Sequence, residues 1–402
     1  MAASEAPPEV RFDVEELLQA ACAETGLDDF GDDDFLEGLR VLARCIDEEA
    51  NLSAAGRFAQ HARLVGSLCT RLTAQDYWNR IPEIHDEEII DPLFVVGLAR
   101  TGTTRLHRLL ACDPSTYSVL WWEARWPSPL PHNDDWHRDD HRIAAAHAEI
   151  DAILETQPVL ASIHPWDAEG PDEEIMLCEH TFKSWVPESF MDIPGYIAWL
   201  SRQDLHPTYA YLERMLKFLQ WQKKSSGRSA ERWVLKAPFH LGYGDMLFET
   251  FPSARVIQTH RDPCETMPSI ASMAYALWGL GRDEADPLEV GRQAFSRWSQ
   301  AVAAFVTCRD TLPPERFFDC DFRSVGADPL GEIARIYDWL NLPLEAPTQT
   351  AMEGWLVKNA RDKRAPHEYS LETFGLTRTD IETEFADYRK RFDLAVSNPR
   401  ED

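Results

Sequence analysis

The stretch LFVVGLARTGTTRLHRLL, residues 93–110, decides the fold of this chain. Its first four residues are apolar and favour β-structure, and they run into Gly97, which indicates a short buried strand. From about Thr104 onward, leucines recur on one side of a helix. A glycine-bearing turn between a strand and a helix points free backbone N–H groups and the positive end of the helix dipole at one place. The stretch therefore predicts an anion-binding loop.

The spacing of this loop is that of a P-loop, but the loop has no lysine. Gly97 and Gly102 follow the pattern G-x-x-x-x-G, and Thr103 stands where a nucleotide triphosphatase carries Lys. Because that lysine would contact the β- and γ-phosphates, its absence indicates a ligand whose anionic group is shorter than a triphosphate. Arg100 supplies a forked cation, and Thr103 and Thr104 supply hydroxyl donors.

Short strand signals alternate with helical periodicity along the rest of the chain. Strands are predicted at 233–235, at 255–258 and near 317–318, and a strand-like segment spans Tyr117–Trp122. Buried strands that alternate with helices predict an α/β fold with a parallel central sheet.

Four segments are predicted around that sheet. Residues 1–90 form a helical N-terminal extension and residues 91–345 form the core. Within the core, residues 121–225 form a helical insertion, and residues 346–402 are a polar C-terminal part with irregular segments, made of a loop and a helix.

A second anion contact is expected at the end of another strand. The segment RVIQTHRDP, residues 255–263, ends a predicted strand next to Arg261, and Ser269 follows eight residues later. Ligands of parallel sheets bind beyond the carboxyl ends of the strands. We therefore expect Arg261 to lie on the same edge of the sheet as the glycine loop.

These motifs resemble those of sulfotransferases that use 3′-phosphoadenosine 5′-phosphosulfate (PAPS). GLARTGTT after a strand, and THRDP followed by the serine, are most similar to bacterial sulfotransferases related to tyrosylprotein sulfotransferases. Between them, Lys236-Ala-Pro238 matches the Lys-x-Pro element of that family. The resemblance covers roughly residues 90–345 and implies a P-loop-like three-layer fold, with PAPS as donor and adenosine 3′,5′-bisphosphate (PAP) as product. It also implies two contact sets: Arg100, Thr101, Gly102, Thr103 and Thr104 around the 5′-phosphosulfate, and Arg261 and Ser269 on the 3′-phosphate.

Sulfuryl transfer needs cations at the leaving phosphate and a base at the acceptor. The resemblance implies Lys236 and Arg100 as the cations. For the base, it points to Glu123, which follows two tryptophans whose burial would raise the pKa of a carboxyl group. A structural carboxylate paired with Arg125 or Arg100 is the alternative for Glu123. His240 is the second candidate base, because cytosolic sulfotransferases use a histidine just past the corresponding lysine.

The insertion also suggests the kind of acceptor. Eight of the 14 tryptophans fall between residues 121 and 221, which suits an apolar or aromatic small molecule with an alcohol, phenol or amine group. For any single tryptophan, core packing is the better explanation. Residues 363–375 resemble a C-terminal loop that closes over the donor, with a plain helix entry at Ser370 as the alternative.

Charge and composition exclude several classes of partner. A formal net charge of −28 argues against nucleic acid and anionic lipid, both of which require a broad basic face. A small anion needs only one cluster, which Arg100, Lys236 and Arg261 can form. No signal segment and no long apolar run is visible, and the eight cysteines are scattered singly. We expect a cytoplasmic protein without stable membrane insertion, without a metal and with the option of homo-oligomers.

Two other functions remain open from the sequence. The first is an ATP-dependent P-loop kinase, against which Thr103 argues. The second is a non-catalytic nucleotide-binding protein of the same fold, against which the presence of Arg100, Lys236, Arg261 and Ser269 together argues.

Overall fold

Five parallel strands form the central sheet of the protein. A computed structural model describes residues 10–131, 133, 135–163, 166–359 and 369–394. The strand order is β2-β3-β1-β4-β5, so β1 lies in the middle. The strands are β1 (Leu93–Gly97), β2 (Thr116–Tyr117), β3 (Arg232–Lys236), β4 (Arg255–His260) and β5 (Phe317–Asp321).

The sheet is the middle of three layers, because β1 is buried on both faces. Leu93 and Val95 pack into one apolar cluster with residues of α4, α14 and α15. Phe94 and Val96 point the other way, into the large cluster that includes residues of α9, α10 and α12. Successive side chains of a strand alternate between faces, so four consecutive apolar residues require a cover on each side. The three-layer α/β fold that the sequence predicts is confirmed.

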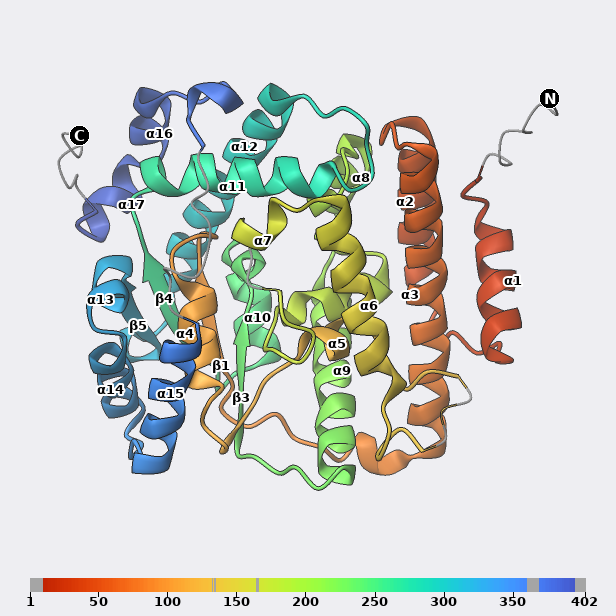
Figure 1. The fold of residues 1–402 in the computed structure, drawn as a ribbon, viewed down its shortest axis with the longest axis horizontal. Coiled ribbons are helices and arrows are strands. Elements are labelled where there is room, and N and C mark those ends of the chain that lie inside the picture. The colour runs from red at the N-terminus through yellow and green to blue at the C-terminus, as the bar shows by residue number, and fades with distance from the viewer. Residues whose placement is uncertain (1–9, 132, 134, 164–165, 360–368, 395–402) are drawn as a thin grey trace.

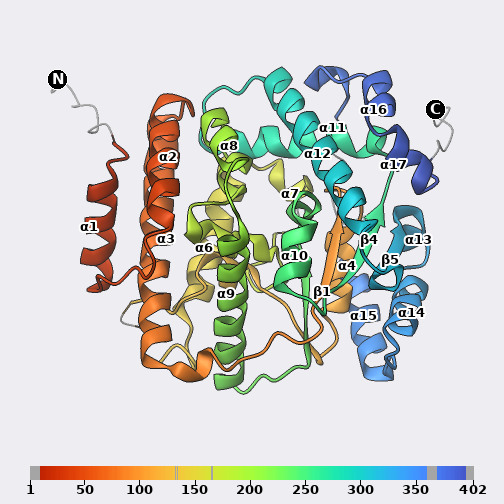
Figure 2. The same ribbon diagram turned by 180° about the vertical axis from the view of Figure 1, so that it is seen from behind.

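Helices at the two ends of the sheet extend the molecule sideways, as Figure 1 shows and Figure 2 repeats from behind. The N-terminal helices α1–α3 stand at one end, and α13–α15 cover the other. The helices up to residue 225 are α1 (Val14–Thr25), α2 (Phe35–Glu48), α3 (Ala54–Arg80), α4 (Thr103–Leu110), α5 (Trp121–Arg125), α6 (His141–Thr156), α7 (Leu160–Ile163), α8 (Pro194–Leu200) and α9 (His206–Ser225). Those after it are α10 (Gly244–Thr250), α11 (Pro263–Trp278), α12 (Pro287–Arg309), α13 (Phe322–Ala327), α14 (Pro329–Leu340), α15 (Ala346–Lys358), α16 (Arg378–Glu384) and α17 (Ala386–Arg391).

Two local predictions need correction. The strand-like segment Tyr117–Trp122 is mostly not a strand: β2 ends at Tyr117, and α5 begins at Trp121. Glu123 causes this change, because its carboxylate accepts a hydrogen bond from the backbone N–H of Leu120 at the start of the helix. The second correction concerns the C-terminal part, where a loop and one helix are predicted and the described residues after 345 include the three helices α15, α16 and α17.

The carboxyl ends of the three central strands meet at one edge of the sheet. Gly97 of β1 is in register with Thr259 of β4, and Val95 of β1 is in register with Lys236 of β3. Residues that follow these strands must therefore lie close together, although they are far apart in the sequence.

No helix among the described residues is both long and apolar enough to cross a membrane. All eight cysteines are free thiols.

Buried histidines make the stability of this core depend on pH. His107 of α4 is fully buried, and its Nε2 lies 3.1 Å from the carbonyl oxygen of Val234 in β3. Burial, helped by the nearby charge of Lys236, lowers the pKa of His107 to about 4. His180, also buried, has its pKa lowered to about 4 mainly by burial.

We predict that the free energy of unfolding falls as the pH is lowered from 7 to 5. An unfolded histidine takes up a proton near pH 6.5 while the folded one stays neutral down to about pH 4, so protons favour the unfolded chain in that window. The loss should be about 2 kcal/mol per buried histidine at pH 5. Urea unfolding at the two pH values measures this loss. The variant His107→Gln should lose less of its free energy of unfolding between pH 7 and pH 5 than the wild type, because it lacks one of the buried histidines. His147→Gln, at an exposed position of α6, should lose as much as the wild type, and an unchanged loss in His107→Gln would contradict the prediction.

Candidate active site

The loop between β1 and α4 has the backbone conformation of an anion cradle. Gly97 has a φ of +152°, and a Cβ at this position would lie 2.3 Å from Thr259 Oγ1, so only glycine fits beside β4. Arg100 and Gly102 have φ of +72° and +89°, in the left-handed region. The chain then enters α4 at Thr103, whose first N–H groups have no partner within the helix and face the loop.

The structure brings the two predicted anion motifs together. Arg100 Nε donates a hydrogen bond to Ser269 Oγ at 3.2 Å. Arg261 Nη1 donates to the backbone oxygen of Arg100 at 3.0 Å, and Arg261 Nε donates to Glu265 at 2.9 Å. A second hydrogen bond, from Arg100 Nη1 to the carbonyl of Ile163, is 2.6 Å long. Residues about 160 positions apart in the sequence thus share one hydrogen-bonded group at the sheet edge.

Thr101 braces the loop from inside. Its Oγ1 donates to the backbone oxygen of Leu98 at 2.6 Å and lies 2.6 Å from Thr259 Oγ1. The side chain is fully buried, and both of these contacts lie within the protein. Thr104, by contrast, is half-buried at the start of α4.

Lys236 forms an ion pair with a carboxylate that the sequence analysis did not identify. Lys236 ends β3 and is almost completely buried, and its Nζ lies 2.5 Å from Glu173 Oε1. Glu173 is 23% exposed, and it precedes the short 3-10 helix Glu174–Thr181. The backbone N–H of Lys236 donates to Glu174 Oε2 at 2.7 Å. Two adjacent carboxylates therefore hold the main chain and the ammonium group of the same lysine.

His240 is enclosed, and both of its ring nitrogens have partners within the protein. Its Nε2 lies 2.7 Å from Glu174 Oε1 and its Nδ1 lies 2.8 Å from the hydroxyl of Tyr209. Both His240 and Glu174 are fully buried. Burial alone would raise the pKa of Glu174, but the hydrogen bond and charge of His240 bring it below the ordinary value. Both ring nitrogens of His240 are thus committed to structural partners, which suits a positioning residue.

Glu123 is likewise engaged within the fold. One carboxylate oxygen accepts from the backbone N–H of Leu120 at 2.8 Å, and the other pairs with Lys223 of α9. Glu123 is only 3% exposed, and burial lowers the pKa of Lys223. Arg125, which the sequence offered as a partner, pairs instead with Glu149 at 2.8 Å. The carboxylate of Glu123 therefore joins α5 to α9, as expected of a structural carboxylate. Its partner is Lys223 rather than Arg125 or Arg100.

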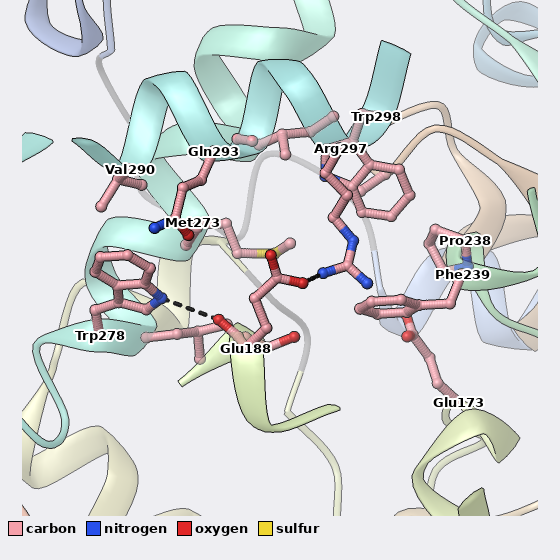
Figure 3. A pocket seen from close by; sticks show the side chains of 16 residues that line it. Glu173, Glu188, Pro238, Phe239, Met273, Trp278, Val290, Gln293, Arg297 and Trp298 are labelled. Carbon is pink, nitrogen blue, oxygen red and sulfur yellow. Dashed lines mark hydrogen bonds and ion pairs between the residues drawn. The ribbon is translucent and has the colours of Figure 1, made fainter. Parts of the chain in front are cut away.

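An apolar cavity of about 110 Å³ opens beside the loop, and Figure 3 shows its lining. Ala99 of the loop and Glu173 both line it, so the carboxylate that pairs with Lys236 borders the same cavity as the loop. Glu188 and Arg297, which both line the cavity, point toward each other and form an ion pair. The apolar lining includes Phe239, Ile270, Met273, Leu277, Trp278 and Trp298.

The tryptophans between residues 121 and 221, which suggested an apolar or aromatic acceptor, do not form the wall of this cavity. Of the eight between residues 121 and 221, none lines this cavity, and only Trp185 lines the larger cavity next to it. Trp121, Trp185 and Trp199 are buried within the large apolar cluster. The aromatic walls come instead from Trp278 and Trp298, which no local pattern distinguished from core residues.

The end of the chain packs against the second anion motif. The hydroxyl of Tyr388 in α17 lies 2.9 Å from His260 Nδ1, and Arg389 Nε donates to Asp262 at 3.1 Å. Residues 360–368, which include much of the predicted closing loop, lie outside the described residues. Ser370 Oγ accepts from the backbone N–H of Thr373 at 3.3 Å, as in a helix entry.

Within the described part of the chain, no group of three or more His, Cys, Asp or Glu side chains is arranged to hold a metal ion.

Comparison with known proteins establishes the family. A sequence model described as "Sulfotransferase family" matches residues 92–346, which is more than half of the chain. The protein therefore belongs to the sulfotransferase family, as the loop and strand motifs predict.

Solved structures of mycobacterial sulfotransferases share the whole fold. STF1 of Mycobacterium tuberculosis H37Rv is 33% identical, with a TM-score of 0.80 over 95% of this chain and 100% of that one. STF9 of Mycobacterium avium is 29% identical, with a TM-score of 0.85 over 98% of this chain and 100% of that one.

A characterised relative is similar over a shorter span. Omega-hydroxy-beta-dihydromenaquinone-9 sulfotransferase Stf3 of Mycobacterium bovis is 25% identical over 260 residues. The match spans 62% of this chain and 63% of the length of Stf3.

We predict that the hydroxyl of Thr101 stabilises the fold and that the hydroxyl of Thr104 does not. Thr101→Val should lower the free energy of unfolding by about 1–2 kcal/mol, because the carbonyl of Leu98 and the hydroxyl of Thr259 lose a buried partner. Thr104→Val, at a half-buried position, should change stability by less than about 0.5 kcal/mol. Urea unfolding of both variants measures this, and equal losses would contradict it.

Proposed function

We propose that the protein transfers a sulfuryl group from PAPS to a hydroxyl group of an apolar small molecule. One observation carries the proposal: a lysine-free glycine loop, Arg261 and Ser269 converge at one sheet edge, beside a Lys236–Glu173 pair that borders an apolar cavity. The glycine loop, the Lys236–Glu173 pair and the apolar cavity are neighbours, because Ala99 of the loop and Glu173 both line the cavity.

The residues at the sheet edge suit PAPS. The loop N–H groups and the start of α4 fit a compact phosphosulfate, and no lysine occupies position 103 to meet a third phosphate. We assign the 5′ side to Arg100, Gly102, Thr103, Thr104 and the loop around Thr101. Arg261 and Ser269 are assigned to the 3′-phosphate. The guanidinium of Arg261 is already oriented by the oxygen of Arg100 and by Glu265, so little side-chain entropy is lost when an anion binds.

Lys236 and Glu173 provide the charges for the transfer. In-line transfer leaves negative charge on the phosphate, which the ammonium group of Lys236 and the guanidinium of Arg100 stabilise. Glu173 is the partly exposed carboxylate that borders the cavity, so it can accept the proton of an acceptor hydroxyl.

We accordingly assign the base to Glu173 rather than to Glu123 or His240. Both oxygens of Glu123 bind Leu120 and Lys223, and both nitrogens of His240 are occupied. His240 and Glu174 act as positioning residues, because Glu174 also holds the main chain of Lys236.

The apolar lining supports an apolar acceptor. The name of the relative Stf3 states that it acts on an omega-hydroxy menaquinone derivative, which is an alcohol on an apolar molecule. This supports an alcohol acceptor here. A P-loop kinase is disfavoured by the family match and by Thr103, and a non-catalytic role is disfavoured by the Lys236–Glu173 pair at the cavity.

The donor assignment predicts a preference for the 3′-phosphate. In calorimetric titrations, PAP should bind at least about ten-fold more tightly than ATP or adenosine 5′-phosphate, because only PAP meets Arg261 and Ser269. Arg261→Gln should weaken PAP binding about 10- to 100-fold. Arg323→Gln, at an exposed arginine paired with Asp321, is the matched control and should bind PAP normally. A preference for ATP, or equal binding of PAP and adenosine 5′-phosphate, would exclude the assignment.

If Glu173 is the base, its substitution should lower kcat strongly and substitution of Glu123 should not. Glu173→Gln should lower kcat for sulfuryl transfer by at least about 100-fold, with PAP affinity nearly unchanged. Glu123→Gln leaves Lys223 without an ionised partner, so it should lower the melting temperature but keep kcat within a few-fold. If Glu123→Gln abolished turnover while Glu173→Gln did not, the base would be Glu123.

A further inference from the structure

A second cavity adjoins the one beside the loop. We call the cavity of about 110 Å³ next to Ala99 and Glu173 the inner chamber. The outer chamber has a volume of about 590 Å³ and lies along α8 and α12, with Trp185 and Tyr243 in its wall. The two chambers share five lining residues, which are Glu188, Phe239, Gln293, Arg297 and Trp298. These shared residues form the boundary between them.

The inner chamber is too small for a whole acceptor. A cavity of roughly 150 Å³ in another protein holds one benzene molecule, and pockets for drug-sized ligands have roughly 300–1,000 Å³. At about 110 Å³, the inner chamber accommodates the reactive end of an acceptor and a few further carbons. Any larger acceptor that reaches Glu173 must extend through the boundary, where the outer chamber offers the remaining space.

An ion pair occupies that boundary. Arg297 of α12 pairs with Glu188 of the 3-10 helix Val186–Ser189, and the two side chains are 20% and 12% exposed. The guanidinium lies over the ring of Phe239, 4.6 Å from its centre, and 5.9 Å from that of Trp298 (Figure 3). Trp278 Nε1 donates to the backbone oxygen of Glu188 at 3.1 Å, which holds the carboxylate in place.

Arg297 stays protonated at neutral pH, because burial lowers its pKa only to about 9. Glu173 is the other charged residue in the lining of the inner chamber, which is otherwise mostly apolar, and Arg292 and Glu289 line only the outer chamber. Separating two charges in apolar surroundings costs free energy unless something replaces their contact. An ion pair at the boundary between two chambers therefore resists displacement.

We propose that Arg297 and Glu188 form a gate that divides the acceptor site, and that an elongated acceptor displaces this pair to occupy both chambers. This inference rests on the proposed function only in one respect, which is that the end of the acceptor in the inner chamber is the end that reacts. The ion pair would determine which acceptors bind. Molecules that fit the inner chamber leave the pair intact, and longer molecules bind only if the burial of their apolar surface outweighs the loss of the pair.

Binding of straight-chain primary alcohols tests the two chambers without any catalysis. We measure the affinity of 1-butanol, 1-hexanol, 1-octanol and 1-decanol for the PAP-saturated protein through the fluorescence of the lining tryptophans. In the wild type, affinity should continue to rise from 1-hexanol to 1-decanol, by up to about four-fold per methylene where the chain is fully buried.

Ala301→Phe fills the outer chamber and should stop the rise beyond 1-hexanol while leaving 1-butanol within two-fold. Ala301 lines only the outer chamber. Ala303→Phe is the matched control, because Ala303 is exposed on the same helix and lines neither chamber. An affinity that levels off at 1-hexanol in the wild type, or that is unaffected by Ala301→Phe, would overturn the two-chamber site.

The gate is tested by removing both charges together. The double variant Glu188→Gln, Arg297→Met should bind 1-decanol at least about five-fold more tightly than the wild type and 1-butanol equally well, because no ion pair has to be displaced. Unchanged or weaker binding of 1-decanol would overturn the gate. The outcome for the proposed function is separate: alcohols that bind as predicted but accept no sulfuryl group from PAPS would disprove the function and leave the chambers in place.

Discussion

The close contact between β1 and β4 at Gly97 and Thr259 is the constraint on which the site depends. Parallel pairing places these two residues in register, and the missing side chain of Gly97 lets the strands end side by side. Thr259 then braces the loop through Thr101. Because β4 continues directly into Arg261 and α11, the same contact brings Arg261 and Ser269 to the loop. A larger residue at position 97 would separate the loop from its second anion motif.

The site concentrates positive charge within a strongly acidic protein. The chain has a formal net charge of −28, yet Arg100 and Arg261 are joined by a hydrogen bond and Lys236 ends the strand next to β1. Carboxylates are built into this group: Glu265 orients Arg261 and Glu173 pairs with Lys236. Cations held in this way are ordered in advance, so they lose little entropy when they meet an anion. Family membership and this geometry point to the same chemistry.

On the other side of the loop, the protein uses buried ion pairs for three different purposes. Lys223–Glu123 joins α9 to α5, Lys236–Glu173 borders the inner chamber, and Arg297–Glu188 lies at the boundary of the two chambers. Glu123 is almost completely inaccessible, whereas Glu173 keeps 23% of its side chain exposed. Access, rather than the presence of a charged partner, distinguishes the structural pair from one that can take part in a reaction.

The sequence by itself determined the sheet and the anion loop, because those signals are local. Apolar runs that end in glycine or arginine predict strands and their carboxyl ends, and the edge of a parallel sheet then brings Arg100 and Arg261 together. The partners of the carboxylates were decided only by the tertiary structure. Glu123 follows two tryptophans and resembles a buried base, but it forms an ion pair with Lys223, which lies 100 residues away in the sequence. Glu173 lies in a plain acidic run, and nothing nearby in the sequence indicates that β3 will place Lys236 against it. Burial and pairing of charged groups depend on contacts between distant segments, and no local pattern encodes them.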